Sequence, residues 1–233
     1  YKGYPELNMQ LTTEAAKFHY EPNWYMGLEY PKERERGYNS LEDLLVPGYF
    51  ETPIKKGESI VFSASVKEPE ETAKLSAMMD KEIAPRLPLD SFYHCLVHAA
   101  HQFKFQKDSE SYLLAGYHWF KSRARDTFIG LTGLTLSIGE TEEFESYMAT
   151  AQKAIYDYIN KRPISVQIYE MEKPDVLLWA IRTVQNYALY TSNKQCYAKY
   201  GTLLKDMLEF IWSGKHPNLF LHENGLLYSN GKK

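Results

Sequence analysis

The chain has 233 residues, 44% of them hydrophobic, which is enough for one large domain or two small ones with a packed core. A net charge of -3 and a pI near 6.2 give no basic surface, so nucleic acid is excluded as an expected partner. No apolar run approaches the ~18 residues of a membrane-spanning helix, and the first residues do not form a signal peptide. Two cysteines, Cys95 and Cys196, lie in apolar helical patterns, so we expect a soluble, cytoplasmic protein.

Residues 1–66 are predicted to form strands and loops. The clearest strand covers residues 60–66, where apolar side chains alternate onto one face. The acidic, polar segment 67–71 follows, and Pro69 suits the start of a helix. We therefore place a domain boundary here, with residues 1–68 in a β-domain and residues 69–233 in a helical domain.

Helical periodicity dominates the second domain. It predicts six helices, over about residues 70–84, 89–106, 126–138, 141–159, 174–188 and 200–212. A hairpin around the Asn224-Gly225 turn is expected to follow over residues 219–228. Connections of such unequal length favour a helical barrel or array over a four-helix bundle.

The most informative stretch is 115–128, where aromatic rings, guanidinium groups and a carboxylate crowd the start of an apolar helix. Arg125 and Asp126 can present a forked donor and a two-oxygen acceptor to vicinal sugar hydroxyls, and Trp119 can supply a stacking face. The alternative is that Asp126 caps its helix and Arg125 forms a solvated ion pair.

Three histidines, His94, His98 and His101, are spaced so that they can share one face of a predicted helix, as metal ligands require. However, Cys95 lies on another face and no His-Glu-x-x-His pattern is present. We therefore favour packed or solvated histidines, and we expect no metal and no cofactor.

Three segments carry a resemblance to a known family. Residues 115–136 resemble the aromatic-Trp-Phe, Gly-Arg-Asp-Thr and Leu-Pro-Gly-Leu signature of bacterial glycogen debranching enzymes of the amylo-alpha-1,6-glucosidase type. Residues 29–50 are similar to the end of that family's amino-terminal β-domain, and residues 174–179 are similar to its Asp-Ala-Ser-Leu-Trp element. The chain departs from the signature at Arg123-Ala124, where the family often has Trp-Gly, and at Thr132, which replaces a proline.

The resemblance implies an α+β protein: the C-terminal part of a β-sandwich-like domain, followed by about half of an (alpha/alpha)6 toroid. It implies inverting hydrolysis of alpha-1,6-linked glucose at branch points, with glycogen or a maltooligosaccharide as the partner. The residues that the resemblance places at the terminal-glucose subsite are Trp119, Arg125, Asp126, Asp175 and Trp179.

An inverting glycosidase needs a carboxylic acid and a carboxylate, roughly 6.5 to 9.5 Å apart. The family's proton donor lies in a Thr-Trp-Met-Asp type motif, which this chain does not contain. We therefore expect a truncated, inactive segment that supplies binding groups; the one substitute acid pair that we consider is Asp126 with Asp175. A non-catalytic carbohydrate-binding module and another sugar-active enzyme with an alpha/alpha toroid remain as alternatives, and the oligomeric state is not predicted.

Overall fold

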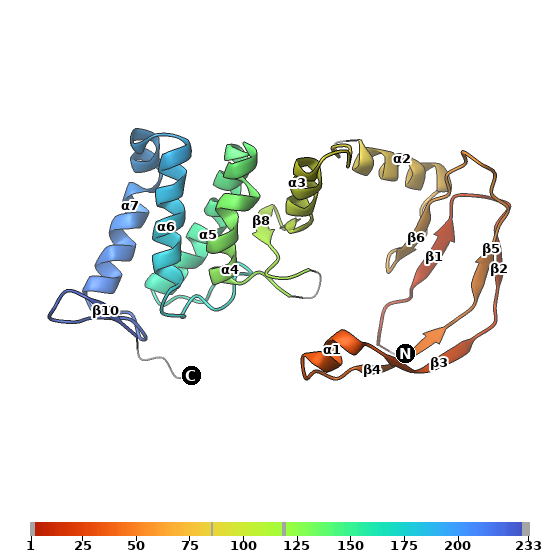
Figure 1. The fold of residues 1–233 in the computed structure, drawn as a ribbon, viewed down its shortest axis with the longest axis horizontal. Helices are drawn as coiled ribbons and strands as arrows, with labels where there is room; N and C mark the ends of the chain where they lie inside the picture. Colours follow the sequence, from red (N-terminus) through yellow and green to blue (C-terminus); the bar gives the residue numbers. More distant parts are fainter. Residues whose placement is uncertain (1–2, 85, 118–119, 230–233) are drawn as a thin grey trace. The chain divides into compact units, whose positions relative to one another are not determined.

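The computed structural model describes residues 3–84, 86–117 and 120–229, and the chain divides into two compact units, 1–86 and 87–233 (Figure 1). The described residues contain seven α-helices and five two-stranded antiparallel sheets, which confirms the predicted α+β class. The domain boundary after residue 68 stays a prediction.

The first unit is built from three ladders. The pairs are β1 (Asn8–Leu11) with β6 (Phe62–Ser65), β2 (Lys17–His19) with β5 (Tyr49–Glu51), and β3 (Asn23–Glu29) with β4 (Leu41–Val46). The predicted strand over 60–66 is found as β6. Between β3 and β4 the chain forms a short helix, α1 (Pro31–Glu35), within the segment predicted as strands and loops, and α2 (Thr72–Ile83) follows the last strand.

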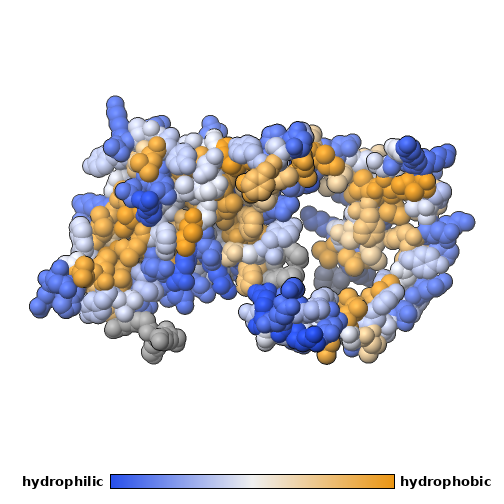
Figure 2. Space-filling view, in the orientation of Figure 1, coloured by the Kyte–Doolittle hydropathy of each residue, from blue (hydrophilic) through white to orange (hydrophobic). Residues whose placement is uncertain are grey.

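Few side chains are buried in the first unit. Among its described residues only Leu75 is buried, whereas Trp24, Met26 and Phe62 are 51%, 69% and 54% exposed. Figure 2 shows hydrophobic residues at the surface of this unit. A two-stranded ladder cannot cover its own apolar face, and stable sheets bury that face against another layer. Sandwich packing of two sheets is not seen among the described residues and stays a prediction.

The second unit begins with α3 (Phe92–Gln102), followed by a hairpin of β7 (Lys104–Lys107) and β8 (Glu110–Leu113). The prediction of a helix up to residue 106 is wrong at its end. The chain turns at Asp108 and Ser109, whose φ angles of 50° and 66° are those of a tight hairpin turn. The usual Asn-Gly signal of such a turn is absent from this segment, so the hairpin was not predicted.

Four further helices complete the second unit and confirm that helices form in the predicted segments, although the first ends at Leu134 rather than near residue 138 and the last begins at Asn193 rather than near residue 200. They are α4 (Ala124–Leu134), α5 (Thr141–Ile159), α6 (Val176–Tyr190) and α7 (Asn193–Trp212); a 3-10 turn (Leu136–Ile138) links α4 to α5, and the predicted final hairpin consists of β9 (Phe220–Leu221) and β10 (Leu227–Tyr228). Gly139 ends the 3-10 turn in a left-handed conformation with φ 85°. None of the described helices is long and apolar enough to cross a membrane.

An aromatic core holds α5, α6 and α7 together. The ring of Phe144 on α5 stacks on that of Tyr187 on α6, with centroids 5.1 Å apart. The ring of Tyr200 on α7 meets Tyr187 edge-on at 5.2 Å. All three side chains are buried, so the helix layer is fixed by large rings in defined geometries.

Helices α4 and α6 lie side by side and run parallel (Figure 1). Three hydrogen bonds between them follow both chains in the same direction: Arg125 with Asp175, the Phe128 carbonyl with Thr183, and Thr132 with Asn186. Both helices therefore begin at the same end of the layer.

Helices α5 and α7 run in the opposite direction to α4 and α6. Phe144, near the start of α5, meets Tyr187, near the end of α6. At their other ends, Tyr158 of α5 and Phe210 of α7 pack with ring centroids 5.6 Å apart. The starts of α4 and α6 and the ends of α5 and α7 consequently share one end of the layer.

The hydroxyl of Thr183 tests the register of α4 against α6. It lies within 2.7 Å of the Phe128 carbonyl and 2.8 Å of the Trp179 carbonyl, and the side chain is buried. We expect Thr183→Val to lower the free energy of unfolding by about 1 kcal/mol, because a buried hydrogen bond is lost at nearly constant volume. Urea unfolding measures the change. The matched control, Thr202→Val at an exposed position of α7, should stay within about 0.5 kcal/mol of the parent; equal losses in the two variants would contradict the assignment.

Candidate functional site

The loop before α6 is fixed to the start of α4 by its backbone. The N–H of Tyr169 donates to the Ser122 carbonyl at 3.1 Å, and the N–H of Ala124 donates to the Tyr169 carbonyl at 2.9 Å. Next to this contact, the hydroxyl oxygens of Ser122 and Thr127 lie 3.3 Å apart, and both side chains are buried. Backbone hydrogen bonds therefore join the first turn of α4 to the loop that leads into α6, and two short hydroxyl side chains pack beside them.

Three of the predicted site residues meet at this end of the layer. A guanidinium nitrogen of Arg125 donates to Oδ1 of Asp175 at 2.8 Å, and the indole Nε1 of Trp179 donates to Oδ2 of the same carboxylate at 3.2 Å. Asp175 is the residue that immediately precedes α6, where the positive end of the helix dipole favours a carboxylate. Residues 50 positions apart in the chain thus form one hydrogen-bonded group; its role in binding a sugar stays a prediction.

Electrostatics keep this pair ionised. The hydrogen bond with Asp175 raises the pKa of Arg125 despite partial burial, and the charges of Asp175, Asp126 and Glu170 add to the effect. Burial by itself would raise the pKa of Asp175, but the hydrogen bond and charge of Arg125 outweigh it and lower the pKa of that carboxyl overall. The two side chains are 45% and 37% exposed, so a ligand in solution can reach both.

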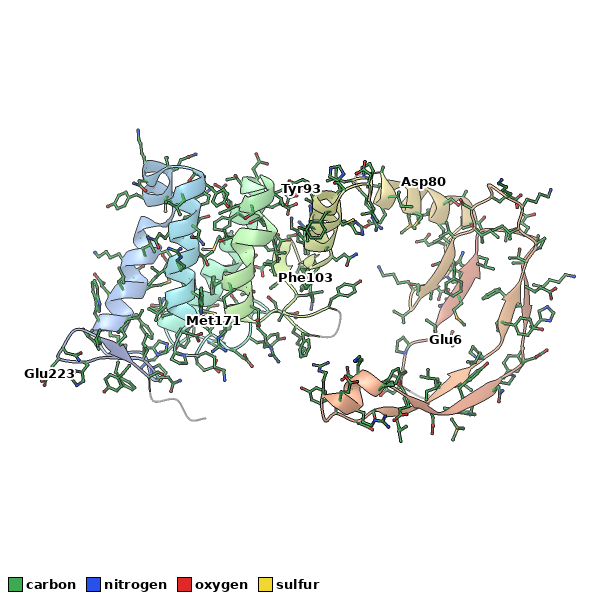
Figure 3. The ribbon with its side chains drawn as sticks, viewed as in Figure 1. Glu6, Asp80, Tyr93, Phe103, Met171 and Glu223 are labelled. Atoms are coloured by element: carbon green, nitrogen blue, oxygen red, sulfur yellow. The ribbon has the colours of Figure 1, made fainter. Side chains whose placement is uncertain are left out.

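Asp126, the other member of the predicted Arg-Asp pair, lies beside Arg125 in α4. It is exposed in the first turn of α4, and the residue before the helix, Arg123, forms no side-chain cap. Asp126 borders a shallow hollow of about 360 Å³ whose other walls are mainly apolar, with Phe103 at the end of α3 and Ile129 among them (Figure 3 labels Phe103). The hydrogen-bonded partner of Arg125 is Asp175 on the neighbouring helix.

Trp119 lies outside the described residues. In the residues that follow it, the guanidinium of Arg123 lies 5.2 Å from the centroid of the Phe120 ring, and the ammonium of Lys121 lies 5.1 Å from that of Tyr169. These contacts are cation-π interactions, which order the segment that leads into α4.

Sequence reasoning missed Tyr169 and Glu170. Glu170 adopts a φ of 65°, which is uncommon for a residue with a side chain, and its charge contributes to the raised pKa of Arg125. Nothing in the local sequence marks it, because glutamate carries no preference for this conformation. A backbone outlier beside a charged pair is the kind of feature that clusters at functional sites.

The three histidines of the metal hypothesis have separate surroundings. Nδ1 of His94 lies 2.6 Å from a carboxylate oxygen of Asp90, and Nε2 of His101 lies 2.7 Å from one of Glu140. Along the part of the chain that the structure describes, no three His, Cys, Asp or Glu side chains, those of His94, His98 and His101 included, are arranged to hold a metal ion. His94 and His101 are thus engaged with carboxylates of the protein.

Two family comparisons match the chain. Residues 1–61 match the family model described as the N-terminal domain of glycogen debranching enzyme, and residues 93–233 match the family model described as amylo-alpha-1,6-glucosidase. No curated protein and no solved structure matches the chain.

These matches define a protein of the glycoside hydrolase class whose family acts on a glucan. The amylo-alpha-1,6-glucosidase match covers more than half of the chain, and the chain therefore belongs to the glycogen debranching enzyme family.

The pair of Arg125 and Asp175 predicts a pH-dependent coupling. Its carboxyl has a folded-state pKa below the ordinary value of 3.8, so the pair stabilises the fold above that pH and loses its effect as the pH falls through the folded-state pKa. A double-mutant cycle of Arg125→Gln and Asp175→Asn should give a coupling of about 0.5 kcal/mol at pH 7, small because solvent screens both groups. Urea unfolding at pH 7 and near pH 2 measures it. A coupling that persists unchanged at the acid pH would contradict the ion pair.

Proposed function

We propose that this chain acts in glycogen debranching and that the end of the layer where α4 and α6 begin binds the alpha-1,6-linked glucose at a branch point. The observation that carries the proposal is the group of Arg125, Asp175 and Trp179, joined by hydrogen bonds within a chain of the debranching family. Glycogen or a branched maltooligosaccharide is the proposed partner.

The chemistry of this group suits a sugar. A guanidinium donates several hydrogen bonds in a fixed plane, and a carboxylate accepts several, so together they match neighbouring hydroxyl groups that both donate and accept. Trp179 is 38% exposed and offers an apolar ring face beside the pair. We assign Trp119 a second stacking role and Asp126 a hydroxyl-accepting role at the adjacent hollow.

The directions of the helices support the proposed fold. Parallel α4 and α6 pack against each other, and α5 and α7, which are parallel to each other, run the opposite way and pack against them. Two opposed sets of parallel helices are what helical hairpins arranged in a ring produce. We propose that residues 69–233 form about half of an (alpha/alpha)6 toroid, that residues 1–68 belong to a β-sandwich-like domain, and that the protein works in the cytoplasm.

We assign binding rather than proton transfer to Asp175. A general acid needs a carboxyl with a raised pKa, whereas the pKa of Asp175 is lowered and both of its oxygens accept hydrogen bonds. The chain also lacks the Thr-Trp-Met-Asp type motif. We therefore propose an inverting mechanism to which this chain contributes substrate-binding groups but neither the catalytic acid nor the base.

Titration calorimetry with a branched maltooligosaccharide tests the binding role. We expect Arg125→Ala to weaken binding by roughly tenfold or more, because hydrogen bonds to a charged group are worth about 1.5 to 3 kcal/mol. The control is Arg182→Ala, an exposed arginine of α6 that hydrogen-bonds Gln185 at 2.8 Å. Equal affinity in the two variants would contradict the assigned site, and no binding by the parent chain would contradict the proposed function.

Glucose release from a glycogen limit dextrin tests the division of roles. Residues 1–233 should bind the dextrin and release no glucose, because the acid and base are assigned elsewhere. Release of glucose by this chain would overturn that assignment and return Asp126 to consideration as a catalytic group. Binding by the full-length enzyme without any release would favour the non-catalytic carbohydrate-binding alternative.

A further inference from the structure

A second hollow lies at the ends of α5 and α7 and has a volume of about 690 Å³. The residues that line it include Tyr156, Asn160, Asp206, Glu209, Trp212 and Lys215. Its lining residues come from the ends of α5 and α7 and the residues just after them, so it is separate from the group around Arg125. We propose that this hollow is a second, non-catalytic glucan-binding site, an inference that rests on the proposed function.

The hollow lies at the same end of the layer as the first site. The ends of α5 and α7 and the starts of α4 and α6 share that end, and the loop after α7 joins the loop before α6 through a hydrogen bond from Asn218 Nδ2 to the Glu172 carbonyl, 3.0 Å. Met171, labelled in Figure 3 near the base of α6, is fully buried next to this junction. Two sites on adjoining faces of one end are placed to hold neighbouring chains of a branched polymer.

An exposed tryptophan provides the stacking surface. Trp212 is the last residue of α7 and lines the hollow, yet 61% of it is exposed. Its counterpart on α5 is Tyr156, whose pKa is raised, first by burial and then by the nearby Asp206 carboxylate. Both rings line the hollow, and the exposed indole offers a flat face on which the apolar side of a pyranose ring can stack.

Two carboxylates are the charged hydrogen-bond acceptors of the hollow. They belong to Asp206 and Glu209, and neither α5 nor α7 has a basic residue in its last turn. Lys215 lines the hollow, and Lys205 lies 3.6 Å from a Glu209 oxygen, so cations of the protein offset the two acids. The chemistry favours a neutral ligand with many hydroxyl donors, which describes a glucan better than a cation.

A second glucan site gives the protein a defined advantage on glycogen. Each particle presents many chain ends, so occupation of one site raises the effective concentration of chain ends at the other. A short linear oligosaccharide cannot exploit this effect. Tight binding to the polymer with weak binding to single chains is therefore the expected signature.

The indole N–H signals in a ¹H–¹⁵N spectrum test the inference, because the chain has four tryptophans and each can be assigned by substitution. We expect maltoheptaose to shift the Trp212 signal. Asp206→Ala should weaken the affinity read from that signal by roughly tenfold, since a charged acceptor is lost. The control is Tyr197→Ala, which removes a 79% exposed ring from the same helix outside the hollow and should leave the affinity unchanged.

The same titration separates this inference from the proposed function. A shift of Trp179 by a branched maltooligosaccharide, with no shift of Trp212 by maltoheptaose, would leave the first site standing and overturn the second. A shift of Trp212 by tetramethylammonium but not by maltoheptaose would also overturn it, because the hollow would then bind cations. Trp212→Ala gives an independent reading: retardation by glycogen in affinity electrophoresis should fall, while the shift of Trp179 by the branched maltooligosaccharide persists. Unchanged retardation would contradict the second site.

Discussion

The register between α4 and α6 determines where every candidate binding group lies. Thr183 fixes it inside the layer through the Phe128 carbonyl, and the pair of Arg125 and Asp175 fixes it at the end where both helices begin. Each residue advances a helix by one third of a turn or less, so a slip of one position would carry the guanidinium away from the carboxylate. The same parallel arrangement places the ends of α5 and α7 beside these starts, which brings the second hollow to the same end of the layer.

Helical periodicity predicted α5, α6 and α7 well because their apolar stripes face a real core, in which Phe144, Tyr187 and Tyr200 are buried. It failed after Gln102, where β7 replaces the end of a predicted helix. That hairpin turns on two non-glycine residues with positive φ, a conformation that no local preference announces. In the first unit the strand pattern identified β6, but alternation alone does not say which surface an apolar face packs on, and Phe62 stays exposed.

For the candidate site, the residue types could be read from the sequence and their partners could not. Arg125 and Asp126 were expected to act together because they are adjacent, yet successive helical residues point about 100° apart, and the hydrogen-bonded partner of Arg125 is Asp175. Asp175 and Trp179 entered only through a family resemblance, and the structure joins them to Arg125 across 50 positions. No sequence pattern marks Glu170 or Asp206 as a site residue. The position of Glu170 depends on the conformation of its loop, and that of Asp206 depends on how the ends of two helices meet.

We propose that the ionised pair of Arg125 and Asp175, whose position is fixed by backbone hydrogen bonds, binds a terminal glucose. Its lowered carboxyl pKa suits hydrogen-bond acceptance and not proton donation. The most direct measurement is a crystal structure with isomaltose, whose alpha-1,6 linkage reproduces the branch point. We expect a glucose ring within hydrogen-bond distance of both Arg125 and Asp175 and in contact with Trp179. Isomaltose bound on another surface, with the pair untouched, would contradict it.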